Sequence, residues 1–324
     1  MQLNILEELP DSFHAQVMIA SWPGLGHVGI GAVDYIRRNL QAVAFAEVDM
    51  RSYFTAEAIV VEDGIAILPD SPTHTFYAVE EHNLILFQSE AQIGGVPGDD
   101  LMHQILDVGE RFGIQSIFTA ASYHMPISYK DGTQVLGVAN NVAFRDSLKP
   151  FGIEILKEGY VTGLNGLLLS FAEQRNIDAA CLLGTMPQYA HQMPNPKASR
   201  EIVLTLSRIL NFEVDMDEID DAAEKMEDTM DEIEAQMQKA ISNMEEGPEG
   251  EFPFGKIEED KVPQYAMERI EKLFNEIGEI GIAISQGQFQ QKANELKREL
   301  DQWTLYRFYE DRFLDLFKPD TEGG

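Results

Sequence analysis

The feature that most constrains the fold is a glycine-rich turn near the start of the chain, "SWPGLGHVGIG", which follows an apolar run and precedes a helix-like segment. Gly24, Gly26 and Gly29 match the G-x-G-x-x-G pattern of dinucleotide-binding folds, and an acidic residue, Glu47 or Asp49, follows roughly twenty residues later. Such a turn joins a strand to a helix in an α/β fold. The pattern therefore predicts an α/β protein and leaves open whether the turn binds a ligand.

The rest of the N-terminal part alternates short apolar runs with amphipathic segments, which favours an α/β sandwich with a largely parallel sheet. The strand-like runs are residues 16–21, 42–49, 56–61, 65–69, 83–89, 115–122 and 179–184. The helix-like segments are residues 28–39, 99–112, 141–149, 164–175 and 197–210.

One connection argues against a nucleotide-binding order of strands. Asp63-Gly64 lies between two strand-like runs and predicts a two-residue hairpin, so the strand at 42–49 is followed by a hairpin with no helix between. A dinucleotide-binding half continues strand, helix, strand instead. Two interpretations stay open: the glycines permit a tight turn with close helix–sheet packing, or the helix N-terminus binds a phosphate or nucleoside-like ligand.

Several motifs together resemble one known family. The turn "WPGLGHVGIGAVDYI", the segment "QSIFTAASYHM" and the segment "EGYVTGLNGLLLSFAEQRNIDAACLLGTMPQYAHQMPNPKAS" are similar, in order and spacing, to signatures of the proteasome assembly chaperone 2 family. The resemblance covers roughly residues 13–212. It implies a three-layer α/β fold, similar to the purine nucleoside phosphorylase type, that serves as a binding scaffold for proteins.

Polar residues beside these motif loops are the candidates for a ligand site. In an open α/β sheet, ligands bind beyond the carboxyl ends of the strands, and we expect these residues there. The candidate ligand-binding residues are Gly24, Gly26, His27, Gly29, Glu90, His124 and Asn165. No G-x-S-x-G nucleophile elbow and no paired-histidine spacing occurs in the sequence, so we predict no catalytic residue, no metal and no cofactor.

A proline- and methionine-rich loop, "TMPQYAHQMPNPKAS", is the candidate protein interface. Exposed Met, Tyr and Pro on a loop suit protein contact, although a loop packed on its own domain fits equally well. The candidate interface residues are Met186, Pro187, Tyr189, Met193 and Pro194.

Charge and cysteine content exclude other functions. The net charge is −31, which disfavours binding to nucleic acid or to anionic membranes. Cys181 is the only cysteine and lies in an apolar run, where an inert core thiol is expected. No apolar run reaches the roughly 18 residues of a membrane span, and no signal peptide is evident. We expect a cytoplasmic protein.

The C-terminal part has a different character. Residues 1–200 carry 11 Lys and Arg against 23 Asp and Glu, and residues 201–324 carry 13 against 32. We predict an α/β domain over 1–213 and an acidic helical region over 214–324, with a loop at 245–263 and further helices at 264–284 and 288–317.

Apolar residues in the acidic region recur at alternating spacings of four and three. This heptad seam runs through Ile219, Ala223, Met226, Met230, Ile233, Met237, Ala240 and Met244. It packs either within one chain or between chains. An aromatic face follows later, made of Trp303, Tyr306, Phe308, Phe313 and Phe317.

From these features we predict a non-enzymatic, self-associating scaffold that resembles proteasome assembly chaperones and assists or adapts a protein complex. The alternative is a small-ligand-binding protein or enzyme that uses the Gly24–Gly31 turn.

Overall fold

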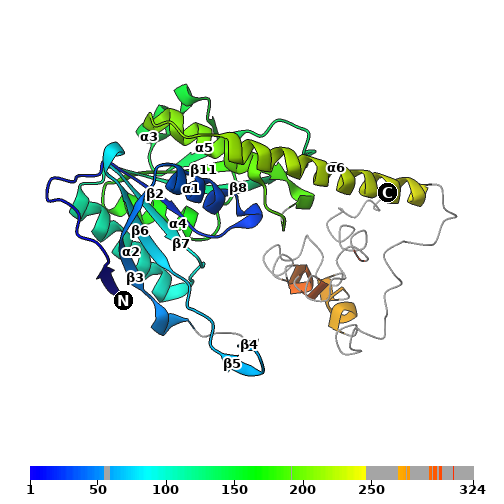
Figure 1. Ribbon diagram of the computed structural model, residues 1–324. Helices are drawn as coiled ribbons and strands as arrows, with labels where there is room; N and C mark the ends of the chain where they lie inside the picture. The colour runs from blue at the N-terminus through cyan, green and yellow to red at the C-terminus, as the bar shows by residue number, and fades with distance from the viewer. Residues whose placement is uncertain are drawn as a thin grey trace, which may run out of the picture. The chain divides into compact units, whose positions relative to one another are not determined.

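A computed structural model describes residues 1–54, 59–190 and 192–245 and, beyond them, residues 269–274, 276–277, 292–293, 295–297, 299–300 and 309. The chain divides into two compact units, Met1–Gln236 and Met237–Gly324. The first unit contains the α/β fold (Figure 1).

The five helices predicted in the N-terminal part are all present, and α6 follows them. The helices are α1 (Val28–Asn39), α2 (Gly95–Phe112), α3 (Val142–Leu148), α4 (Leu164–Gln174), α5 (Pro196–Leu210) and α6 (Asp217–Glu245). The strands are β1 (Gln2–Ile5), β2 (Val17–Ser21), β3 (Val43–Asp49), β4 (Val60–Glu62), β5 (Ile65–Ile67), β6 (His74–Val79), β7 (Leu84–Ser89), β8 (Ser116–Met125), β9 (Val135–Ala139), β10 (Glu154–Ile155) and β11 (Asp178–Pro187).

The main sheet is mixed, which corrects the expectation of a largely parallel one. Its nine strands have the order β1-β3-β6-β7-β2-β8-β11-β9-β10. The central strands β7, β2, β8 and β11 are parallel, whereas β1, β3 and β6 pair antiparallel on one side and β9 pairs antiparallel with β11 on the other. The antiparallel side arises because no helix returns the chain between β3 and β6 or between β6 and β7.

The predicted hairpin is the two-stranded sheet β4–β5. Glu62 pairs with Ile65, and the two turn residues Asp63 and Gly64 have φ angles of 49° and 80°. Positive φ at both positions is the geometry of a type I′ turn, which Asp-Gly favours. Sequence patterns missed β1, β6, β9 and β10. Strand β6 was missed because five of its six residues are buried, so its sequence does not alternate between apolar and polar residues.

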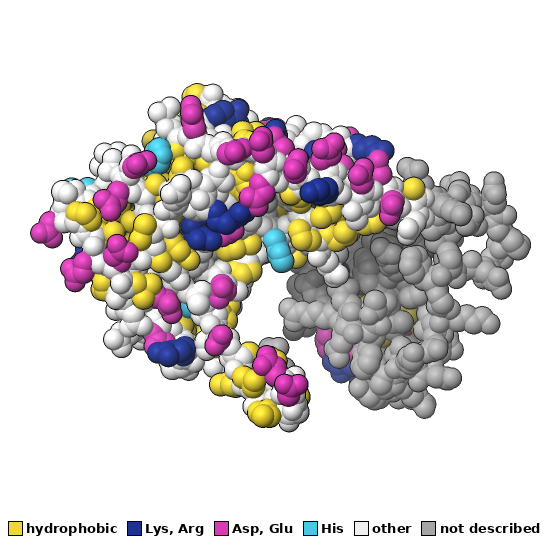
Figure 2. All heavy atoms as spheres, viewed as in Figure 1, with side chains coloured by type: hydrophobic (Ala, Val, Ile, Leu, Met, Phe, Trp, Pro, Cys, Tyr) yellow, Lys and Arg dark blue, Asp and Glu magenta, His cyan; other side chains and the backbone are white. Residues whose placement is uncertain are grey.

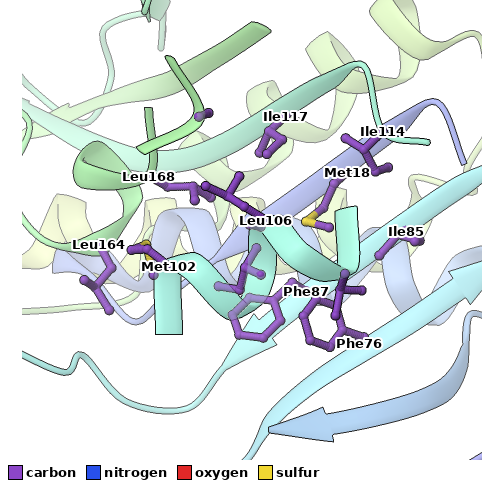
Figure 3. Close-up of a cluster of buried hydrophobic side chains, with 14 of the residues drawn as sticks. Met18, Phe76, Ile85, Phe87, Met102, Leu106, Ile114, Ile117, Leu164 and Leu168 are labelled. Carbon is purple, nitrogen blue, oxygen red and sulfur yellow. The ribbon is translucent and has the colours of Figure 1, made fainter. Parts of the chain in front are cut away.

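Helices cover both faces of the sheet, and each interface has its own apolar core. Helices α2 and α4 pack on one face, and α1, α3, α5 and the start of α6 pack on the other. Figure 3 shows how side chains of α2 and α4 meet those of the strands in the first core, labelled as Met18, Phe76, Ile85, Phe87, Met102, Leu106, Ile114, Ile117, Leu164 and Leu168. The architecture is a three-layer α/β sandwich.

Cys181 lies in the middle of this core on β11 and is fully buried. Burial raises the pKa of its thiol to about 12, so the thiol stays protonated and unreactive. This is the environment expected of a core thiol.

Beyond the end of α6 at Glu245, the described residues of the second unit are helical and lie within the ranges 264–284 and 288–317. Arg269 binds Glu295 at 2.6 Å and Glu299 at 2.7 Å, and Phe274 stacks on Tyr309. The predicted loop at 245–263, apart from Glu245, and the aromatic face from Trp303 to Phe317 lie outside the described residues.

Candidate functional site

The glycine-rich turn connects β2 to α1 at the carboxyl edge of the sheet. Trp22 is fully buried and its ring lies 5.3 Å from that of Phe87. Gly26 has a φ of 66°, and His27, which precedes the first residue of α1, also has a left-handed φ of 50° and is exposed. The chain thus turns from strand to helix within the six residues between Ser21 and Val28.

Packing explains Gly29, and the left-handed backbone conformation explains Gly26. A Cβ atom at Gly29 would lie 2.0 Å from the carbonyl oxygen of Ala120, because α1 passes directly over β8. A Cβ atom at Gly26 would lie 2.7 Å from the Sδ atom of Met186. Gly24 is exposed, with open space around it. The first interpretation, a tight turn with close helix–sheet packing, therefore accounts for Gly26 and Gly29 without a ligand.

Asn165, a predicted ligand residue, holds the turn in place. Its Oδ1 atom accepts a 3.1 Å hydrogen bond from the Trp22 backbone N–H, and its Nδ2 atom donates to the Trp22 carbonyl at 3.4 Å. The Thr119 hydroxyl donates to the Asn165 backbone carbonyl at 2.7 Å. Asn165 is only 2% exposed, so its amide joins the end of β2 to the start of α4.

Gln92 makes a second bridge that the sequence did not reveal. Its Nε2 atom donates to the Pro23 carbonyl at 2.7 Å, and its Oε1 atom accepts from the Leu164 backbone N–H at 3.0 Å. Gly163 is the neighbour whose Cβ would meet the Gln92 amide at 3.0 Å. No local motif marks Gln92, because its partners lie 69 and 72 residues away. Three loops, after β2, after β7 and before α4, are thereby joined at one edge.

Four large apolar side chains on or beside these loops are exposed. Leu25 is 52% exposed, Val96 71%, Tyr160 92% and Leu167 48%. These four residues define the carboxyl-edge surface. Single exposed apolar side chains are ordinary, but four of them, on the glycine-rich turn, the loop before α4 and the first turns of α2 and α4, suit protein contact.

Glu90 and His124, the other predicted ligand residues, have different neighbours. The Glu90 carboxylate accepts a 2.8 Å hydrogen bond from the Thr73 backbone N–H. His124 lies in β8, half-buried, beside Met186 in the parallel register of β8 and β11. Within the described residues, no set of three His, Cys, Asp or Glu side chains is placed to hold a metal ion.

The proline- and methionine-rich loop is less exposed than the sequence suggested. Met186 and Pro187 are buried, which corrects the expectation that they offer side-chain surface, since β11 extends through both residues. Met193 is half-buried and Pro194 is exposed. The Asn195 backbone N–H donates to the Gly26 carbonyl at 2.8 Å, so this loop and the glycine-rich turn meet.

Tyr189, the fifth residue of that predicted interface, contacts α6 instead. Its hydroxyl donates a short hydrogen bond to the Glu234 carboxylate, which also accepts from the Tyr129 backbone N–H at 3.0 Å and from the Ser128 hydroxyl at 2.8 Å. Burial and this bond raise the pKa of Tyr189 to about 12. The Tyr189 hydroxyl and the other donors lower the pKa of Glu234. We name these four residues the Glu234 hub.

A row of ion pairs continues along α6 from this hub. Basic residues of α1, α5 and the loop after β8 face acidic residues of the helix. The pairs are Arg38–Glu218 at 3.0 Å, Arg200–Asp220, Lys197–Glu227 at 2.9 Å and Lys130–Asp231 at 3.0 Å. Ile219 and Met230 of the heptad seam join the same core as α1 and α5. The described part of the seam therefore packs within the chain.

An apolar groove lies where α1, the start of α5 and α6 meet. It has a volume of about 330 Å³, and it brings together Gly26, His27 and Pro194 with Ile219 and Met226. In this groove, residues of the predicted ligand site lie beside a residue of the predicted interface.

The fold and these loops define a class of protein: a three-layer α/β sandwich whose glycine-rich turn is joined to neighbouring loops by the side chains of Asn165 and Gln92. Over residues 18–234 the sequence matches the model of the PAC2 family. The match spans more than half of the chain, and the protein belongs to the PAC2 family.

Individual proteins and solved structures are also similar to this chain. An uncharacterized protein of Methanocaldococcus jannaschii is 24% identical over 230 residues, which cover 69% of this chain and 86% of that protein. The structure is similar to that of Pyrococcus furiosus PbaA, an archaeal homolog of proteasome-assembly chaperone, with a TM-score of 0.58, 23% identity and coverage of 75% and 96% of the two chains. It is also similar to P. furiosus PbaB, an archaeal proteasome activator, with a TM-score of 0.60, 23% identity and coverage of 72% and 98%.

Among the helices in the described part of the chain, none combines the length and the hydrophobicity that a membrane crossing requires.

Proposed function

We propose that the protein is a non-enzymatic scaffold that binds protein and assists the assembly of, or adapts, a protein complex. Membership of the PAC2 family is the observation that carries this proposal. The names of the similar structures, a proteasome-assembly chaperone homolog and a proteasome activator, make proteasome subunits the first partners to test. The proposal places the protein in the cytoplasm, as a homo-oligomer that binds neither nucleic acid nor a membrane.

The contacts of the predicted ligand-binding residues favour a scaffold over a small-ligand site. Asn165 and Gln92 bind backbone groups of neighbouring loops, Gly29 is required by packing, and Gly26 is required by its positive φ. Loops that are already joined by hydrogen bonds and that expose large apolar side chains can bind a protein partner without being ordered first. We therefore assign partner binding to the carboxyl-edge surface, with Tyr160 and Val96 as its most exposed members.

The experiment compares the tagged full chain with a Val96→Ser, Tyr160→Ser variant, each expressed in its native cells at its native level. Truncation of an anchor residue costs about 2 kcal/mol or more in binding, which is about thirtyfold in Kd. Quantitative mass spectrometry should find a protein complex enriched with the unaltered chain and lost with the variant. Val142→Ser, at a residue of α3 that is 63% exposed, is the matched control and should retain the complex.

Two results would count against this proposal: enrichment of no complex, or equal enrichment by the edge variant. The alternative, a phosphate or nucleoside-like ligand on the Gly24–Gly31 turn, has its own readout. A ligand at a hundred times its Kd adds about 2.7 kcal/mol to the free energy of unfolding. A thermal shift with phosphate or a nucleoside that disappears in His27→Ala would favour that alternative.

A further inference from the structure

Glu234 of α6 holds two loops of the α/β sandwich at once. Its carboxylate accepts from the Ser128 hydroxyl at 2.8 Å and from the Tyr129 backbone N–H at 3.0 Å, both in the loop between β8 and β9. It also accepts from the hydroxyl of Tyr189, which follows β11. The Tyr129 N–H donates to the Tyr189 hydroxyl oxygen as well, at 3.1 Å. The two loops therefore meet at this carboxylate.

Ion pairs brace the same part of α6. Lys130 pairs with Asp231 at 3.0 Å, and Lys197 pairs with Glu227 at 2.9 Å. Figure 2 shows acidic side chains along α6 with basic ones among them. The acidic residues at 227, 231 and 234 are spaced by four and three positions, so they lie on one face of the helix. Because that face is held against the sandwich, the position of the Glu234 carboxylate is fixed.

A short segment connects Tyr189 to the glycine-rich turn. Six residues after Tyr189, the Asn195 backbone N–H donates to the Gly26 carbonyl at 2.8 Å. Asn195 is only 2% exposed, and its side chain caps α5 by accepting from the Ala198 backbone N–H at 2.9 Å. The segment 188–195 thus has two anchors, the Glu234 hub at its start and the α5 cap at its end. Its placement against the turn depends on both.

The turn needs contacts of this kind because its own geometry is unfavourable. Gly26 and His27 have left-handed φ angles of 66° and 50°, and α1 has no side-chain cap at its N-terminus. The left-handed conformation is unfavourable for a residue with a side chain, such as His27. Hydrogen bonds from distant loops must therefore hold the turn in this conformation.

The exposed side chain of Leu25 lies between two of these hydrogen bonds. On one side, Gln92 donates to the Pro23 carbonyl at 2.7 Å. On the other side, the Asn195 N–H donates to the Gly26 carbonyl. The position of Leu25 in the carboxyl-edge surface therefore depends on both loops, and the loop after β11 is the one that α6 holds.

From these contacts we propose that Glu234 is a positioning residue for the carboxyl-edge surface. Its carboxylate fixes Tyr189, and the segment 188–195 carries that constraint to Gly26. The turn then presents Leu25 in one position. The inference rests on the proposed function and deepens it, because it makes α6 a regulator of partner binding at a surface that α6 does not itself form.

Native-state amide hydrogen exchange on the full chain tests this positioning without any partner. The substitution Tyr189→Phe removes only the hydroxyl that binds Glu234. We expect the Asn195 and His27 amides to exchange about fivefold faster or more in this variant, because local openings set their exchange rates. The Ile19 amide, in the central strand β2, reports larger openings and should change less.

Glu234→Gln is the second variant. An amide replaces a carboxylate that only accepts hydrogen bonds, so its NH2 group must face one of the donors. The effects of Glu234→Gln and Tyr189→Phe should be non-additive, since both weaken the same hydrogen bond. Glu232→Gln is the matched control, because Glu232 is exposed on the same helix and the change in charge is identical. Its exchange rates should match those of the unaltered chain.

Faster exchange confined to Asn195 and His27 supports the proposal. An equal change at Ile19 would show a merely structural role and overturn it, and so would rates in Tyr189→Phe that match those of the control. Capture from native cells is the functional readout. Tyr189→Phe should lower the yield of the complex that the unaltered chain enriches, and full retention would overturn the regulatory role. If the unaltered chain enriches no complex, the proposed function fails, while the exchange rates still decide whether Glu234 positions the turn.

Discussion

Helix α6 and the β4–β5 hairpin, residues 59–68, which we call the hairpin arm, both extend from the α/β sandwich and are both rich in apolar residues, yet α6 is partly buried and the hairpin arm is exposed. Met230 of α6 is fully buried, whereas the six large apolar residues of the arm are 41–72% exposed. The helix differs because the sandwich supplies complementary partners: a core under the seam, basic residues opposite its carboxylates, and the Glu234 hub. The comparison teaches that an apolar pattern needs a matching surface before it becomes part of the core.

The largest expected effect comes from the buried seam. Met230→Ala removes a fully buried side chain and leaves a cavity, which should lower the free energy of unfolding by about 2–5 kcal/mol. Ile65→Ala in the hairpin arm should change it by less than about 0.5 kcal/mol, measured where the chain is monomeric. Urea denaturation of both variants checks the difference. Equal losses would show that the two regions do not differ in the way described.

The base of the arm should respond to pH. His74 begins β6, is fully buried, stacks on Phe54 and shares a 2.8 Å hydrogen bond with Ser89. Burial lowers its pKa to about 4, and the nearby Glu90 charge opposes this shift. As pH falls from about 6.5, the unfolded chain binds the proton first. The free energy of unfolding should therefore fall between about pH 6.5 and 4, by at most about 1.4 kcal/mol per pH unit.

The matched variant for this pH effect is His74→Asn, which keeps a polar atom near Ser89 and does not titrate. Its unfolding free energy, followed by urea denaturation across the same pH range, should lack this slope. A variant with the same slope as the unaltered chain would assign the effect to other groups.

The Glu234 hub should give the smallest effect. Glu234→Gln removes a charge that accepts hydrogen bonds from three donors at a partly exposed position, and solvent screening limits the loss to about 1 kcal/mol. Since the folded-state pKa of Glu234 lies below its usual 4.5, its contribution is present above that pH and is lost as pH falls through the lowered value. The difference between the two proteins, from denaturation at pH 7 and at acidic pH, should shrink on acidification. A difference in unfolding free energy that grows on acidification would contradict the role given to the Glu234 carboxylate.

The sequence by itself determined the features that depend on neighbouring residues. The Asp63-Gly64 turn, the five helices of the sandwich, the start of α6 and the family signature of the glycine-rich turn follow from spacing and turn chemistry within a few residues. These features were also sufficient to predict the three-layer fold and the PAC2 family.

The tertiary structure decided what each pattern contacts. Gln92 and Asn165 act on backbone groups 69 to 143 residues away, Met186 and Pro187 become buried because β11 extends through them, and β6 is buried too completely to show alternation. The heptad seam defined an apolar stripe, but only the position of α1 and α5 gave that stripe a surface within the chain. The physical reason is that local periodicity sets the conformation of a segment, whereas burial and hydrogen-bond partners depend on segments that folding brings together from distant parts of the sequence.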